Sequence, residues 1–161
     1  MISIFNRQRS ISISQHQIKD ICRQILKILS YENASLSILI TTNRGIRKFN
    51  KQFLGKDSPT DILSFPTFNP KELASQHKSA KGLYLGDIII SAERVLRDTQ
   101  KIIASGIDID FETWLNRLFV HGICHLVGYD HETEKDFKKM NAKEQEILSL
   151  LGTSVPLYPI I

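Results

Sequence analysis

The sequence has few of the features that mark secreted, membrane or repeat proteins. Its two cysteines, Cys22 and Cys124, are too few for a disulfide framework, which indicates a reducing compartment. No run of hydrophobic residues is longer than three, so neither a membrane-spanning helix nor a signal peptide is expected. Internal repeats and Gly/Ser-rich linkers are also absent. We therefore expect one domain over residues 1–161, a cytoplasmic location and no membrane partner.

Acidic residues are scarce in the first third of the chain. Residues 1–56 hold ten Lys/Arg and only two acids, whereas residues 57–161 hold eleven Lys/Arg and fifteen acids. Clustered cations favour a polyanionic partner, because they release counterions from a phosphate backbone. A basic face that is merely solvated explains the same composition equally well. The candidate nucleic-acid-binding residues are Arg47, Lys48, Lys51 and Lys56.

The hydrophobic pattern predicts a mixed chain of strands and helices with a small sheet. Alternating apolar residues indicate strands, and apolar residues at helical spacing after a polar cap indicate amphipathic helices. The apolar run Ile88-Ile89-Ile90 is typical of a central strand covered on both faces. Residues 67–81 form the longest predicted loop. The predicted strands lie within residues 2–13, 36–40, 62–65 and 84–90, and the predicted helices begin after Ser14, Asn43, Ser91, Asp108 or Asp110, and near Glu132.

Three of the five histidines stand close together, in the run HGICHLVGYDH at residues 121–131. On a helix, His121 and His125 are one turn apart and present two imidazoles on one face. Gly128 can take a positive φ and end that helix, after which the chain can return so that His131 completes a triad. Three neutral imidazoles are the ligand set of a catalytic zinc site with an open position. The spacing therefore predicts a metal site on a helix and the turn that follows it.

Three neighbours of these histidines matter for the chemistry. Cys124 either faces the metal or is a small core residue, and the second interpretation is favoured. Asp130 either accepts a hydrogen bond from a ligand imidazole or belongs only to the turn. Gly122 stands where the same spacing in metzincin proteases has the glutamate that acts as general base. A peptidase needs that carboxylate, so its absence argues against proteolysis.

The 121–131 run resembles the signature of the YbeY family, bacterial metal-dependent endoribonucleases of ribosomal RNA maturation. Two further segments are similar to motifs of that family, GKDSPTDILSFP at residues 55–66 and LGDIII at residues 85–90. The resemblance extends from about residue 35 to residue 152. It implies a single α+β domain, in which a small, mostly parallel mixed sheet of about four strands packs with five or so helices.

The same resemblance implies one zinc ion per chain, held by His121, His125 and His131. It also implies a single-strand-specific endoribonuclease of 16S rRNA 3′-end maturation and ribosome quality control, with ribosomal RNA and the small ribosomal subunit as partners. We expect zinc to lower the pKa of a bound water and to polarise the scissile phosphate. The attacking group is either that water or the ribose 2′-hydroxyl, and Asp57 and Asp130 are the candidate general bases.

One position departs from the family pattern. Leu54 stands directly before Gly-Lys-Asp, where the family usually has an arginine thought to engage RNA near the metal. A leucine cannot bind phosphate, so either Lys56, Lys51 or Arg47 replaces the arginine, or phosphate contact at that point is weaker. A zinc-containing ribosome-assembly factor that binds RNA without strong nuclease activity is therefore the alternative function, and a metallopeptidase is a third. If the basic segment serves RNA, then Arg47, Lys48, Lys51 or Lys56 must border the cleft of the histidines.

Overall fold

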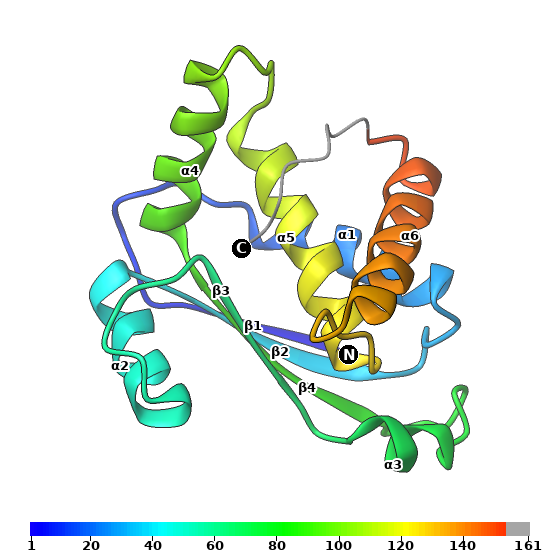
Figure 1. Cartoon of the computed structure of the whole chain (residues 1–161). Helices are drawn as coiled ribbons and strands as arrows, with labels where there is room; N and C mark the ends of the chain where they lie inside the picture. The colour runs from blue at the N-terminus through cyan, green and yellow to red at the C-terminus, as the bar shows by residue number, and fades with distance from the viewer. Residues whose placement is uncertain (154–161) are drawn as a thin grey trace.

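Strands and helices build one four-stranded sheet with helices on both faces in the computed structural model, which describes residues 1–153 (Figure 1). The α+β class and the small mixed sheet confirm the prediction, although the described residues form six helices where five or so were expected. None of these helices is both long enough and apolar enough to cross a membrane. The strands are β1 (Ile2–Asn6), β2 (Ser35–Thr41), β3 (Ile62–Pro66) and β4 (Tyr84–Ser91), and the helices are α1 (Gln15–Ile28), α2 (Asn43–Leu54), α3 (Pro70–Ala74), α4 (Ala92–Ala104), α5 (Phe111–Leu126) and α6 (Glu134–Leu150).

The sheet has the strand order β1-β2-β4-β3. Strands β1, β2 and β4 are parallel, whereas β3 pairs with β4 in the antiparallel direction. β4 lies between β2 and β3, as its apolar run predicts, and Ile88, Ile89 and Ile90 are all buried. Strand β3 is at one edge of the sheet, next to the segments that carry the site described below.

The two faces of the sheet are covered unequally. Helices α1, α4, α5 and α6 lie over one face and α2 lies against the other (Figure 1). Because side chains alternate along a strand, Ile88 and Ile90 enter the larger core, whereas Ile89 packs with Ile46 of α2 and Leu63 of β3. The edge strand β3 therefore contacts α5 on one face and α2 on the other.

Polar side chains set the beginnings of the helices. Ser14, Asp110 and Thr133 each accept a hydrogen bond from a backbone N–H three residues further along, which satisfies a donor that the first helical turn leaves unpaired. Of the two caps considered for α5, Asp110 is therefore the one used, and Asp108 lies outside the helix.

Two segments differ from the prediction. The predicted loop over residues 67–81 contains the short helix α3, which begins with a reciprocal capping box between Asn69 and Glu72 and has proline in its first turn. The first strand ends at Asn6, because the side chain of Gln8 bonds both to that asparagine and to the backbone of Ile11 and so closes a turn.

Candidate functional site

Helix α5 and the turn after it bring three histidines together. His121 and His125 lie on the same face of α5, one turn apart. Gly128 follows the helix with a φ of 97°, a left-handed conformation that reverses the chain, and its N–H bonds to the carbonyl oxygen of His125. His131 therefore returns to the other two rings, and one ring nitrogen from each of the three histidines lies within 4.8 Å of the others.

The three imidazoles fit a tetrahedral metal ion. The Nε2 atoms of His121 and His125 are 3.2 Å apart, and two nitrogens bound to zinc at about 2.0–2.1 Å in a tetrahedron are separated by about 3.3 Å. His121 is buried, His125 is half-buried and His131 is exposed, so one side of the group is open to solvent. Within residues 1–153 no fourth His, Cys, Asp or Glu joins the group. This donor set could hold a metal ion and leave a coordination position open.

The protonation of His125 also suits a metal ligand. The pKa of His125 is lowered to about 4. Burial of the ring is the largest cause, and the neighbouring His121 and His131 rings lower the pKa further. The ring is therefore neutral at pH 7, and a neutral imidazole has the lone pair that a metal requires.

A buried carboxylate on α6 orients His121. Glu144 Oε1 lies 2.6 Å from His121 Nδ1, and its Oε2 accepts a hydrogen bond of 3.5 Å from Arg117. Glu144 is 4% exposed and Arg117 is 3% exposed. A bond at Nδ1 fixes the ring and directs Nε2 toward the site. This pair was not predicted from the sequence, although a glutamate among the buried residues Met140 and Ile147 of α6 was a usable signal.

The histidines open into a cleft of about 370 Å³. One wall consists of α5 and the turn to His131, and the opposite wall consists of the end of α2, Lys56 and residues 58–61. Strand β3 lies between the two walls. Leu54, at the position of the family arginine, lines this cleft and is 53% exposed. Lys56 lines the same cleft, so a cation is present two residues from the position where the arginine is absent.

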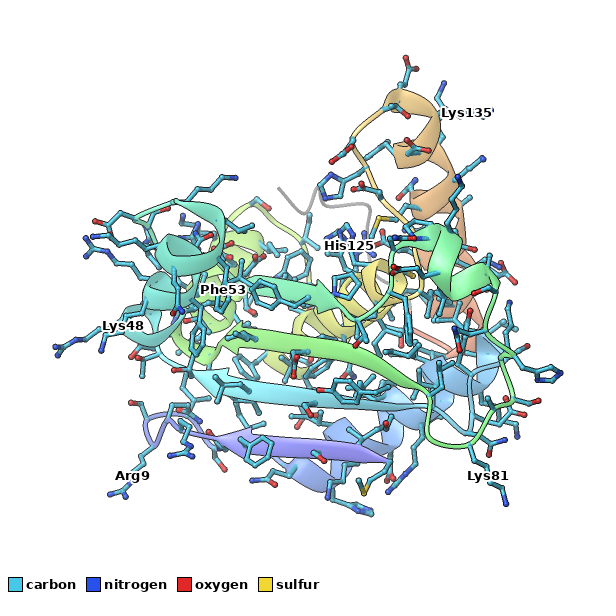
Figure 2. All side chains as sticks on the ribbon, turned by 90° about the horizontal axis from the view of Figure 1, so that it is seen from below. Arg9, Lys48, Phe53, Lys81, His125 and Lys135 are labelled. Carbon is cyan, nitrogen blue, oxygen red and sulfur yellow. The ribbon has the colours of Figure 1, made fainter. Side chains whose placement is uncertain are left out.

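The other three predicted cations do not line the cleft. Arg47 Nε and Lys51 Nζ lie 2.8 and 3.5 Å from the carboxylate oxygens of Asp57, so an exposed ion pair offsets part of their charge. Lys48 points outward from α2, away from His125 (Figure 2). The basic segment and the histidines therefore meet at Lys56.

The carboxylate in the cleft is not one of the two candidate general bases. Asp57 pairs with Arg47, which lowers the pKa of Asp57, and it stands outside the cleft lining. Asp130 also stands outside it, and its Oδ1 accepts a hydrogen bond from the backbone N–H of His131. Asp61 does line the cleft, and burial raises the pKa of its carboxyl group.

Gly122 and Cys124 both face the protein interior. A Cβ atom at Gly122 would lie 2.8 Å from Ile62 Cδ1 and 3.1 Å from Ile88 Cδ1, so α5 and the sheet approach each other too closely for a side chain. The position that carries the glutamate in metzincins therefore points to the sheet and has no room for one. Cys124 is fully buried in the main core and burial raises the pKa of its thiol, as expected for a packing residue.

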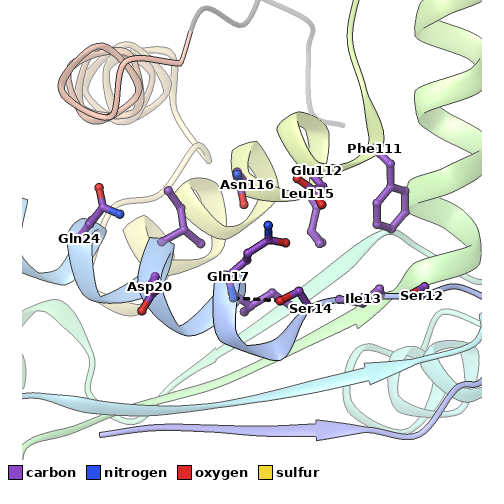
Figure 3. Close-up of a pocket in the computed structure, with 12 residues that line it drawn as sticks. Ser12, Ile13, Ser14, Gln17, Asp20, Gln24, Phe111, Glu112, Leu115 and Asn116 are labelled. Atoms are coloured by element: carbon purple, nitrogen blue, oxygen red, sulfur yellow. Dashed lines mark hydrogen bonds between the residues drawn. The ribbon is translucent and has the colours of Figure 1, made fainter.

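A second cavity, of about 290 Å³, lies between the first turns of α1 and α5 (Figure 3). Its acidic residues are Asp20, which pairs with His16 and Arg23 on the surface, and the exposed Glu112. The hydrogen bond from the Gln17 backbone to Ser14 caps α1 beside it. Ser14 and Asp20 are thus already engaged at the beginning of α1. The histidine cleft is therefore the candidate functional site.

The chain is similar to known proteins over nearly its whole length. A family model described as endoribonuclease YbeY matches residues 3–152. The chain is 36% identical to endoribonuclease YbeY of Geobacter metallireducens over 152 residues, which cover 93% of this chain and 95% of that protein. It is 40% identical to endoribonuclease YbeY of Sulfurihydrogenibium sp. over 140 residues, with 86% and 84% covered. The fold is similar to the solution structure of a Thermotoga maritima protein, with a TM-score of 0.57, 24% identity, and 99% and 100% of the two chains covered.

Proposed function

Because the chain belongs to the endoribonuclease YbeY family, we propose that it is a zinc-dependent endoribonuclease specific for single-stranded RNA. Its substrate is ribosomal RNA, which it processes during 16S rRNA 3′-end maturation and ribosome quality control. It works in the cytoplasm with the small ribosomal subunit, and residues 1–161 are one catalytic domain. The observation that carries this proposal is the convergence of three histidines at the open side of a cleft that also contains Lys56.

The choice of zinc follows from the donor set. Three neutral imidazoles with an open fourth position are typical of catalytic zinc, whereas magnesium and calcium prefer oxygen ligands. When bound, zinc supplies Lewis acidity, which polarises a phosphoryl oxygen and makes water in the site a stronger acid. His121, His125 and His131 would hold the ion, and Glu144 keeps the His121 ring in position through its bond to Nδ1.

Two residues of the opposite wall act on the substrate. The Lys56 ammonium forms no ion pair with any described residue, so it is free to bind an RNA phosphate in the cleft. Asp61 is the carboxyl group that lines the same cleft, and burial raises its pKa, which makes the carboxylate a stronger base. Lys56 thus positions the phosphate and Asp61 moves the proton.

The other functions fit the site less well. A structural zinc in an assembly factor needs a fourth protein ligand, and Cys124, the nearest sulfur in the sequence, lies in the core. A metallopeptidase needs a carboxylate at position 122, where the sheet leaves no space for one.

The proposal is tested with the His125→Ala variant and metal analysis. We expect wild-type protein to carry about one zinc per chain and to cleave a 16S rRNA precursor near its 3′ end, and the variant to lose both zinc and cleavage. His77→Ala is the matched control, because His77 is exposed, its ring bonds to the Ser79 hydroxyl and it lies outside the cleft. Full cleavage by a folded, zinc-free His125→Ala variant would rule out the metal mechanism. A zinc-loaded wild type that binds the precursor without cleaving it would instead identify an assembly factor.

A further inference from the structure

An exposed phenylalanine stands at the end of α2. Phe53 is 56% exposed although it belongs to a cluster of aromatic rings. Its ring is stacked on Phe49, with centroids 6.3 Å apart and planes 6° apart, and lies 5.2 Å from the ring of Phe65 at 58°. Two neighbouring rings therefore hold Phe53 in place while much of its surface remains free for a ligand.

The cluster is continuous with the histidine cleft. Phe65 contacts Phe53 and also lines the cleft, as does Leu54, the residue that follows Phe53. Figure 2 shows Phe53 beside β3, on the side of α2 that is turned toward the strand. A polymer with one phosphate in the cleft can therefore place a neighbouring group on the Phe53 ring.

We propose that Phe53, supported by Phe49 and Phe65, is a stacking platform for one unpaired base of single-stranded RNA. The proposal rests on the proposed endoribonuclease function, because it takes the cleft as the place of the RNA backbone. An aromatic ring can stack on a base only when that base has left its own stack, which single strands allow and an A-form duplex does not. The platform thus gives a physical reason for a single-strand preference.

The charge around the platform selects RNA over an apolar protein partner. Helix α2 has four Arg/Lys and no acid. Arg44 and Lys48 form no ion pair with any described residue, and Lys56 is unpaired in the adjoining cleft. An apolar protein surface that covered Phe53 and the adjoining cleft would desolvate Lys56 without a counter-charge, whereas an RNA backbone neutralises Lys56 while a base covers the ring.

The test follows RNA binding, which is measured separately from RNA cleavage. Binding of an eight-nucleotide single-stranded RNA to zinc-loaded protein is followed by fluorescence anisotropy, beside binding of an RNA duplex. We expect Phe53→Ala to weaken single-strand binding about tenfold, the size of one lost base–aromatic stack, and to leave duplex binding nearly unchanged. Phe53→Tyr should restore binding, and Phe53→Leu should not, because leucine keeps the apolar bulk without the flat ring. The control Phe5→Ala removes a phenylalanine that is 52% exposed on β1, at the opposite edge of the sheet from β3.

A second arm uses RNA with one abasic nucleotide at successive positions. One position should weaken binding to wild type and have no further effect on Phe53→Ala. Single-strand affinity of Phe53→Ala within twofold of wild type would overturn the platform, as would wild-type protein that binds no single-stranded RNA or a Phe53→Leu variant that binds normally. If wild type fails to cleave RNA while Phe53→Ala still weakens binding, the nuclease proposal fails and the platform stands.

Discussion

The two walls of the cleft are built in opposite ways. The α5 wall is buried at its base, since His121 is 8% exposed and the two charged residues behind it, Glu144 and Arg117, are 4% and 3% exposed. The α2 wall is exposed and basic, with Phe53 and Leu54 more than half exposed and Lys56 beside them.

The difference in burial suits the two walls to two different tasks. Buried polar groups keep fixed positions, because each must retain its partners in a medium of low dielectric constant. Such a wall suits an ion that needs ligands at set distances. Exposed side chains reach solvent and can adjust to a flexible polymer. Substitutions on the α5 wall should therefore change stability and metal affinity, and those of the exposed residues Phe53 and Lys56 on the α2 wall should change RNA affinity.

The largest effect is expected for Glu144→Ala. The substitution leaves the Arg117 charge buried without its partner, which costs about 3–5 kcal/mol of unfolding free energy. It also frees the His121 ring, so metal affinity should fall about 10–100-fold. Denaturant unfolding of the metal-free protein and zinc competition with a chelator measure the two effects.

Glu144→Gln keeps an acceptor for His121 Nδ1 and should recover part of the metal affinity. Glu146→Ala is the matched control on the same helix, because Glu146 is exposed and pairs with Lys143 at the surface. Wild-type stability and zinc affinity in Glu144→Ala would show that the α5 wall does not depend on its buried pair.

Gly122→Glu should rank next. The new side chain would collide with Ile62 and Ile88 and bury a carboxylate, for a destabilisation of about 3 kcal/mol. For a chain of this length that lowers Tm by about 6–12 °C. Thermal unfolding measures the change, and Ala104→Glu, at an exposed helix position, is the control. An unchanged Tm, or the appearance of peptidase activity, would mean that position 122 faces the cleft.

Lys56→Ala should have the smallest effect, confined to the α2 wall. Loss of one phosphate contact reduces the slope of log affinity against log salt by about 0.7 for single-stranded RNA, and stability should stay within about 0.5 kcal/mol of wild type. Salt titrations of RNA binding measure the slope. Lys51→Ala should change it less, because Asp57 already pairs with Lys51, and Lys27→Ala on α1 should not change it. A Lys56→Ala slope equal to wild type would remove Lys56 from the RNA contacts.

Local features were predictable from the sequence. Spacing along one helix and a glycine after it are enough to bring His121 and His125 near His131, because helical geometry and the turn at Gly128 fix their relation. The central position of β4 followed in the same way from its run of isoleucines.

Long-range features were not predictable in the same way. Glu144 reaches His121 only because α6 packs on α5, and the sequence separates the two residues by 23 positions. Which of the cations lies in the cleft could be decided only from the path of residues 55–61. That path puts Lys56 into the cleft and turns Asp57 back to Arg47. The helix α3 was missed for another reason, since its capping box lies in a segment too short and too polar for a periodic signal.

Strand β3 couples the two walls through the alternation of its side chains. Ile62 and Ser64 face Gly122, whereas Leu63 and Phe65 face the α2 side. Inserting or deleting one residue within the strand would exchange the two sets, so that Phe65 would press on the glycine and the aromatic cluster would lose its support. The five residues of β3 are therefore constrained in number as well as in type, since a change of length would disturb both walls at once.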